Sequence, residues 1–195
     1  MRALEFFHLC ENLKRTKRTG WVEHGIQQPE SIADHMHRMA LMAMLVDDPS
    51  INRERCVKMA IVHDLAEAIV GDITPHAGVS KEEKHRMEQD AMERIRDMLG
   101  NTEQANEIYA LWQEYEEART DEALFVKDLD KYEMIVQALE YEKGKRASMA
   151  MPRLMRASTA QGATLDSFFD STLGRFQHPL VRGWVNELMQ ERAQK

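Results

Sequence analysis

The chain has 195 residues, of which 43% are hydrophobic and 30% charged, a balance typical of a globular protein that can bury a sizeable core. Its formal net charge of −7 argues against general binding to nucleic acid polymers or to an anionic membrane, although one local basic cluster is enough to hold a small phosphorylated molecule. Only Cys10 and Cys56 are present, which excludes a disulfide framework, and no apolar run approaches the ~20 residues of a membrane helix.

The first predicted element is a short helix from Leu4 to Leu13. Its apolar part is broken by Glu5 and His8, so it lacks the continuous core of a signal peptide. With so few cysteines, we expect a reducing, cytoplasmic location. The length and the absence of any linker composition predict one domain over residues 1–195.

A basic segment follows, with four cations in the five residues from Lys14 to Arg18 and an aromatic residue at Trp21. Three interpretations are open: a solvated loop, a targeting signal, or a clamp for a phosphate group. In the last of these, Arg18 donates hydrogen bonds and Trp21 forms an apolar wall.

The next helix should begin at Ser31, because Asp34 three residues later completes a capping-box pattern. Its apolar members continue it as a largely buried helix: Met36, Met39, Ala40, Ala43 and Leu45. His35 lies on the side of Met39 and Ala43. His37 is turned by about 200° from His35 on a helix, so we do not expect both histidines to serve one site. The segment 47–49 should end the helix.

The stretch from Val57 to Gly71 predicts a second buried helix, apolar nearly all the way round. It contains His63, Asp64 and Glu67, whose spacing directs all three to one side of a helix. Burying such groups is costly unless they are compensated. They could form a hydrogen-bonded cluster that only stabilises the core, or they could bind a divalent metal.

Asp72 follows the expected helix end at Gly71, where a cleft would open. Charged helices with thin apolar stripes should then cover residues 81–98 and 103–118, and we assign core contacts and no chemistry to those stripes. Helices are also expected over 165–173 and 180–188. No strand pattern or internal repeat is evident.

The helix predicted from Asp121 to Tyr141 carries two acids, Asp128 and Asp130. Asp130 shares a helix face with Val126 and Met134, so it is predicted to be the buried acid, although the sequence alone does not settle the choice. The following segment 143–162 is rich in Lys, Arg, Ser, Ala and Met and is interpreted as an exposed insertion.

The ordered set His35, His63-Asp64 and Asp130 resembles the signature of the HD-domain phosphohydrolases, which place these residues on separate helices of an all-α fold. Further segments resemble the HD domain-containing protein two group, which is related to the bacterial 5′-deoxynucleotidases. These segments are Lys17-Arg18-Thr19-Gly20-Trp21, Pro29-Glu30-Ser31, Asp34-His35-Met36, Val62-His63-Asp64, Val70-Gly71-Asp72-Ile73, Lys81-Glu82-Glu83-Lys84-His85-Arg86, Phe125-Val126-Lys127 and Phe169-Asp170-Ser171-Thr172.

The resemblance implies an all-α fold with a buried metal site between its helices. His35, His63, Asp64 and Asp130 would be the metal ligands. Two imidazoles and two carboxylates suit one divalent transition metal, such as Mn, Co, Fe, Ni or Zn, better than Ca.

The resemblance also implies the roles of the remaining site residues. Glu67 would act in catalysis, by orienting the attacking water or moving its proton. Arg18 would hold the phosphate and Asp72 would contact the sugar 3′-hydroxyl. The aromatic residue that helps exclude a ribose 2′-hydroxyl is displaced here to Trp21 by Thr19-Gly20.

We therefore expect a metal-dependent 5′-deoxynucleotidase, whose partner is a deoxynucleoside 5′-monophosphate and which forms a homodimer by family resemblance. An HD-type phosphodiesterase or nucleoside triphosphohydrolase is the alternative enzyme. A two-metal phosphodiesterase would need further histidines, for which His76 and His85 are the candidates. A non-catalytic module that binds metal or nucleotide is the third interpretation.

Overall fold

The computed structural model describes residues 2–75, 77–150 and 165–194, and it describes side chains for all of these except 145–150. The all-α prediction is confirmed, since the only strand-like pairing within these ranges is an isolated antiparallel bridge between Lys17 and Ser31. The helices of this part are α1 (Ala3–Arg15), α2 (Thr19–Glu23), α3 (Ile32–Ala43), α4 (Arg53–Val62), α5 (Glu67–Val70), α6 (Lys81–Met98), α7 (Glu103–Glu117), α8 (Asp121–Ala150), α9 (Asp166–Thr172) and α10 (Pro179–Ala193).

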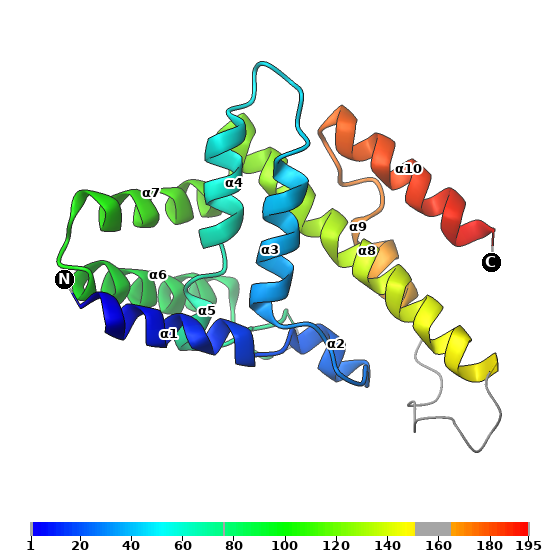
Figure 1. The fold of residues 1–195 in the computed structure, drawn as a ribbon, viewed down its shortest axis with the longest axis horizontal. Coiled ribbons are helices and arrows are strands. Elements are labelled where there is room, and N and C mark those ends of the chain that lie inside the picture. The colour runs from blue at the N-terminus through cyan, green and yellow to red at the C-terminus, as the bar shows by residue number, and fades with distance from the viewer. Residues whose placement is uncertain (1, 76, 151–164, 195) are drawn as a thin grey trace.

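The long helix α8 organises one half of the molecule (Figure 1). Helices α3 and α4 pack against each other and against α8, and α9 and α10 also contact α8. The other half consists of α1, α5, α6 and α7, which contact one another in a chain of helix pairs. Helix α7 also contacts α4 and α8, so it joins the two halves. None of the helices in the described ranges is long and apolar enough to cross a membrane.

Each half has its own hydrophobic cluster, and the polar site residues lie where the two clusters meet. Met39 and Val62 belong to the cluster around α3, α4 and α8. Met36 and Leu65 belong to the cluster around α1, α5 and α6. His63 and Asp64 stand between Val62 and Leu65 in the chain. His63 and Asp64 therefore lie in a polar layer between two hydrophobic clusters. Polar and charged groups buried there need partners within the protein.

The start of α3 follows the sequence prediction. The Asp34 amide donates to Ser31 Oγ at 3.2 Å, and the Ser31 amide donates to Asp34 Oδ2 at 2.8 Å, which completes the capping box. His35 is fully buried whereas His37 is exposed, as their angular offset predicted. The predicted end was wrong, because α3 stops at Ala43 and Leu45 is 64% exposed.

The predicted continuous helix from Val57 to Gly71 was also wrong. Helix α4 ends at Val62, and residues 63–66 form turns before α5 begins. The amides of Leu65 and Glu67 each donate to the carbonyl oxygen three residues back, at 3.0 Å, so the backbone tightens here. Complete burial was wrong as well, since Ile61 is 51% exposed. Gly71 does end the segment, with a φ of 77° that glycine adopts without strain.

The predicted boundary at Tyr141 was wrong, because α8 continues to Ala150. Residues 143–150 of the predicted insertion are thus helical, and Lys143 and Gly144 are exposed on the helix. The rest of that prediction, 151–162, lies outside the described residues, as does His76. The two closing helices appear as α9 and α10, close to their predicted positions.

Candidate metal centre and active-site cavity

Two buried imidazoles lie at the boundary between the halves, and their hydrogen-bond partners determine which ring nitrogen carries the proton. His35 Nδ1 lies 2.5 Å from Glu133 Oε2, and His63 Nδ1 lies 3.0 Å from the Ala60 carbonyl oxygen. Both partners are acceptors, so each Nδ1 carries the proton and donates it. The Nε2 atoms of both rings are buried without a hydrogen-bond partner. Two unpaired acceptor nitrogens in a buried site are the donor set that a transition metal satisfies.

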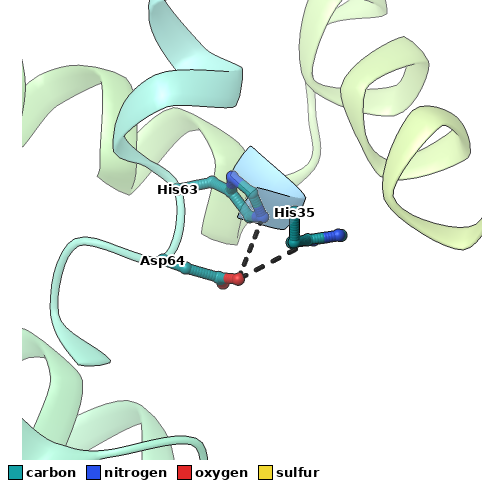
Figure 2. A group of neighbouring side chains, drawn as sticks. All are labelled: His35, His63 and Asp64. Carbon is teal, nitrogen blue, oxygen red and sulfur yellow. Dashed lines mark ion pairs between the residues drawn. The ribbon is translucent and has the colours of Figure 1, made fainter. Parts of the chain in front are cut away.

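Asp64 lies beside the two imidazoles, and its carboxylate is directed at both (Figure 2). Its Oδ2 is 3.2 Å from His63 Nε2 and 3.9 Å from His35 Nε2. One ligand atom from each of these three residues lies within 4.8 Å of the other two. Asp130 approaches from α8, with its Oδ1 at 3.2 Å from His35 Nε2. His35, His63 and Asp64 therefore form one group of potential ligands, which Asp130 joins through its contact with His35. The nitrogens and oxygens of these four side chains fit a divalent transition metal.

The two acids differ in a way that the sequence did not predict. Asp128 is fully buried, whereas the Asp130 side chain is 31% exposed, so the prediction that Asp130 is the buried acid was wrong. Asp128 faces the chain before α10, where its Oδ2 accepts from the amides of Gln177 and His178 at 2.6 and 2.8 Å. Asp130 instead faces the cavity and the imidazole of His35. Asp130, the more exposed of the two acids, is therefore the one that lies at the site.

A cavity of about 830 Å³ opens beside the four converging residues. His63, Asp64 and Asp130 line it, and so do the four residues predicted to act on the substrate: Arg18, Trp21, Glu67 and Asp72. All of the predicted site residues except the fully buried His35 thus reach one concave space. A pocket that combines polar groups with apolar walls is typical of a small-molecule site.

Arg18 contacts two of the acids at the site, Asp64 and Asp130. Its Nη1 is 3.3 Å from Asp64 Oδ2, and its Nη2 is 4.0 Å from Asp130 Oδ1. Burial alone would lower the pKa of Arg18, but the charges of Asp64 and Asp130 raise it above its ordinary value. The guanidinium is therefore held as a cation in the wall of the cavity.

Trp21 and Asp72 each have a fixed position in the cavity wall. Trp21 is 2% exposed; its Nε1 donates to Glu30 Oε1 at 2.8 Å, and its ring packs 4.3 Å from the ring of Phe168. Asp72 Oδ2 accepts from the Thr19 amide at 2.6 Å, and the Asp72 carbonyl accepts from Thr19 Oγ1 at 2.8 Å. Asp72 thereby holds the start of α2, which carries Trp21 next to Arg18.

Glu67 is the most unusual acid of the cavity. It is 4% exposed, and its buried Oε2 has no hydrogen-bond partner. Burial raises the pKa of Glu67 well above its ordinary value, and the charges of Asp64 and Asp72 raise it further. A carboxyl with a raised pKa beside possible metal ligands is a candidate for general acid–base chemistry.

Several residues at the site were missed by the sequence analysis. Tyr115 was assigned only core contacts, but its hydroxyl donates to Asp130 Oδ2 at 2.8 Å and its ring lies 4.8 Å from that of His63. A buried tyrosine needs a hydrogen-bond partner for its hydroxyl, and this need could have indicated that Tyr115 contacts a polar residue. Lys84 and Lys127 also line the cavity. Glu133 gave no signal, because its partner His35 is 98 residues away in the chain.

A family model for the HD domain matches residues 10–167 of the chain. The match covers most of the sequence and includes every residue of the converging set described above. The chain therefore belongs to the HD domain family. The all-α architecture of the described residues agrees with that membership.

Curated relatives and a solved structure are similar over nearly the full length. The 5′-deoxynucleotidase hdd1 of Schizosaccharomyces pombe is 51% identical, covering 100% of this chain and 92% of the relative. The human 5′-deoxynucleotidase HDDC2 is 46% identical, covering 97% and 86%. The crystal structure of the PH0347 protein from Pyrococcus horikoshii is 30% identical, with a TM-score of 0.68 and 96% of each chain covered.

Proposed function

We propose that this protein is a metal-dependent 5′-deoxynucleotidase, which hydrolyses deoxynucleoside 5′-monophosphates to a nucleoside and phosphate. Relatives that carry this name are 46 to 51% identical over nearly the whole chain. The observation that carries the proposal is the pair of unpartnered Nε2 atoms, on His35 and His63, beside a cavity lined by Arg18 and Glu67.

His35, His63, Asp64 and Asp130 would hold the metal. Their Nε2 atoms and carboxylate oxygens already converge, while the Nδ1 protons are engaged elsewhere. A divalent transition metal held by these groups would lower the pKa of a bound water and neutralise phosphate oxygens.

Arg18 binds the phosphate in this proposal. In the described structure its guanidinium pairs with Asp64 and Asp130, two of the proposed ligands. If those carboxylates held a metal, it would share their negative charge, which would leave Arg18 free to bind the substrate. A guanidinium then donates two parallel hydrogen bonds to phosphate oxygens and holds the phosphorus in line for attack.

Glu67 accepts the proton of the attacking water. Its raised pKa makes it a stronger base than an ordinary glutamate, and its lack of a hydrogen-bond partner leaves Oε2 free to take that role. The phosphorus–oxygen bond to the sugar 5′ oxygen then breaks, and the leaving alkoxide needs a proton. Protonated Glu67 or solvent can supply it.

Asp72 and Trp21 select the sugar. With Asp72 Oδ2 engaged by Thr19, Oδ1 is left to accept a hydrogen bond from the 3′-hydroxyl. Trp21 presents an apolar ring whose Nε1 is already bonded to Glu30, so the ring offers no partner to a ribose 2′-hydroxyl. A hydroxyl desolvated without a partner costs about 1–3 kcal/mol, roughly ten- to a hundredfold in discrimination.

The proposal includes a cytoplasmic location and a homodimer. The location is supported by the free thiols of Cys10 and Cys56, which suit a reducing compartment. The dimer is supported by the family resemblance. The net charge of −7 favours a small-molecule substrate over a nucleic acid polymer.

The test is phosphate release from matched deoxy- and ribonucleoside 5′-monophosphates, 3′-monophosphates, triphosphates and cyclic dinucleotides, each with several metals after chelation. We expect deoxynucleoside 5′-monophosphates to be the best substrates. Hydrolysis of triphosphates or cyclic dinucleotides, with monophosphates untouched, would favour the alternative HD enzymes. Metal binding without turnover on any of these substrates would favour a non-catalytic module.

A further inference from the structure

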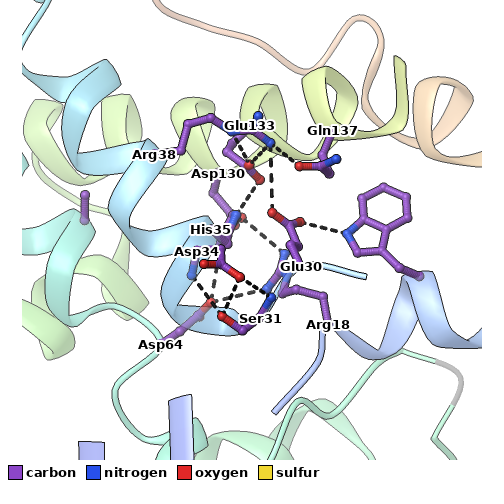
Figure 3. Close-up of polar contacts among 12 residues, drawn as sticks. Arg18, Glu30, Ser31, Asp34, His35, Arg38, Asp64, Asp130, Glu133 and Gln137 are labelled. Atoms are coloured by element: carbon purple, nitrogen blue, oxygen red, sulfur yellow. Dashed lines mark hydrogen bonds and ion pairs between the residues drawn. The ribbon is translucent and has the colours of Figure 1, made fainter. Parts of the chain in front are cut away.

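A charged chain of contacts runs from His35 through Glu133 to Arg38 (Figure 3), and neither Glu133 nor Arg38 lines the cavity. Glu133 of α8 and His35 of α3 are both fully buried, with Glu133 Oε2 at 2.5 Å from His35 Nδ1. The other oxygen of Glu133 accepts two hydrogen bonds from Arg38, at 2.7 Å from Nε and 2.5 Å from Nη2. Burying a carboxylate together with an imidazole and a guanidinium costs free energy. Such an arrangement therefore indicates that the position of the carboxylate matters.

Arg38 is itself fixed between α3 and α8. Its guanidinium also donates to Gln137 Oε1 at 2.5 Å and to Glu140 Oε2 at 2.8 Å, each about one turn further along α8 from the last. The two helices are thus joined by a row of hydrogen bonds that begins at His35. This row orients the carboxylate plane of Glu133 toward the imidazole.

Glu133 is poorly placed to bind a metal itself. Glu30, His35 and Glu133 do form a second group of potential ligands. However, the 2.5 Å between Nδ1 and Oε2 is shorter than the roughly 3 Å that separates two ligand atoms on a common metal with bonds near 2.1 Å. The guanidinium of Arg38 also already supplies the positive charge that Glu133 requires. The group is therefore a hydrogen-bonded cluster rather than a second metal site.

The two histidines of the candidate metal centre differ in what supports them. His63 donates its Nδ1 proton to a neutral backbone carbonyl, whereas His35 donates to a carboxylate. A carboxylate partner fixes the tautomer and ring orientation and makes the opposite nitrogen a stronger donor to a metal. We infer that Glu133, held by Arg38, is a positioning residue that keeps the Nε2 lone pair of His35 directed at the metal. This inference rests on the proposed metal centre.

The test compares Zn²⁺ and Co²⁺ affinities of the purified full-length protein by competition with a chelating dye. Glu133→Gln keeps the size of the side chain but removes its charge, and we expect metal affinity to fall about 10- to 100-fold. Asp128→Asn is the matched control, because Asp128 is an equally buried acid on the same helix that faces away from His35. We expect that control to leave metal affinity unchanged. Arg38→Met should lower affinity less than Glu133→Gln does, because the carboxylate remains in place.

A second measurement separates positioning from a general loosening of α8. Histidine ring ¹H–¹⁵N correlation spectra of the Zn²⁺-loaded protein should show the Nδ1–H tautomer for His35. In Glu133→Gln that proton should exchange faster, while the signals of His63 should not change. Folding of each variant is checked by circular dichroism in the presence of chelator.

Three outcomes would overturn the inference. A folded Glu133→Gln protein that binds Zn²⁺ as tightly as the unmutated protein would remove the positioning role. An equal loss of affinity in Asp128→Asn would show that any buried acid of α8 has the same effect. Failure of the unmutated protein to bind either metal would overturn the metal centre of the proposed function, and is recognised before any variant is compared.

Discussion

Glu67→Gln tests whether Glu67, a buried acid with a raised pKa, is the proton acceptor. The amide fills the same buried space but cannot accept the proton of the attacking water. We expect turnover to fall by about 10²- to 10⁴-fold, which is a rise of about 2.7–5.4 kcal/mol in the barrier. Metal affinity should not change, because Glu67 is not one of the four proposed ligands.

The same substitution should not destabilise the metal-free fold. The pKa of Glu67 is raised above its ordinary value of 4.5 by burial and by Asp64 and Asp72. When the folded state raises the pKa of an acid, the free energy of unfolding of the protein falls as the pH rises above the pKa of that acid in the unfolded chain. The reason is that the fold disfavours the carboxylate form. The Glu67→Gln protein escapes this loss, so its advantage in free energy of unfolding should grow from about pH 4.5 upward.

Three assays check this prediction: kcat on a deoxynucleoside 5′-monophosphate, metal content by elemental analysis, and chemical unfolding in chelator at pH 5 and pH 8. Unchanged kcat would show that Glu67 is structural. Equal loss of metal and turnover would show that it is a ligand. A variant less stable than the unmutated protein at pH 8 would refute the argument that the charged carboxylate of Glu67 destabilises the metal-free fold.

The remaining predictions concern the metal, the choice of acid and the substrate. Metal at a hundredfold its Kd should stabilise the unmutated protein by about 2.7 kcal/mol, measured by thermal unfolding, whereas His63→Ala should gain nothing and lose activity. Asp130→Asn should release metal while Asp128→Asn retains it; the reverse result would mean that the ligand is the other acid. Arg18→Ala should lower kcat/KM for all nucleotides alike. Trp21→Ala should narrow the gap between deoxy and ribo substrates from its expected ten- to a hundredfold, and equal kcat/KM for dAMP and AMP in the unmutated protein would refute the deoxy preference.

The helix starts and the buried face of α3 could be predicted from local patterns. Ser31 and Asp34 are three residues apart, so the capping box that they form depends on no other part of the chain. The opposite fates of His35 and His37 follow from the angular period of a helix. Such features are set within one or two turns, which is the range over which sequence spacing determines geometry.

The break after Val62 was not predictable from the same patterns. An apolar run with helical spacing looks continuous, and nothing in the residues 63–66 themselves is a strong helix breaker. The backbone tightens where the chain passes from one hydrophobic cluster to the other, and the position of that boundary depends on the packing of α1, α6 and α8. Tertiary contacts therefore decided where the helix ends.

The two acids of α8 show most clearly where the sequence stops being informative. The sequence alone determined an all-α chain with a nitrogen and oxygen donor set in the right order, because residue types and helical periods are local properties. Only the tertiary structure decided that Asp128 faces the chain before α10, that Asp130 faces His35, and that Glu133 supports His35 from behind. Each of those contacts joins residues about 50 to 98 positions apart, and their geometry is fixed by how α3, α8 and α10 pack.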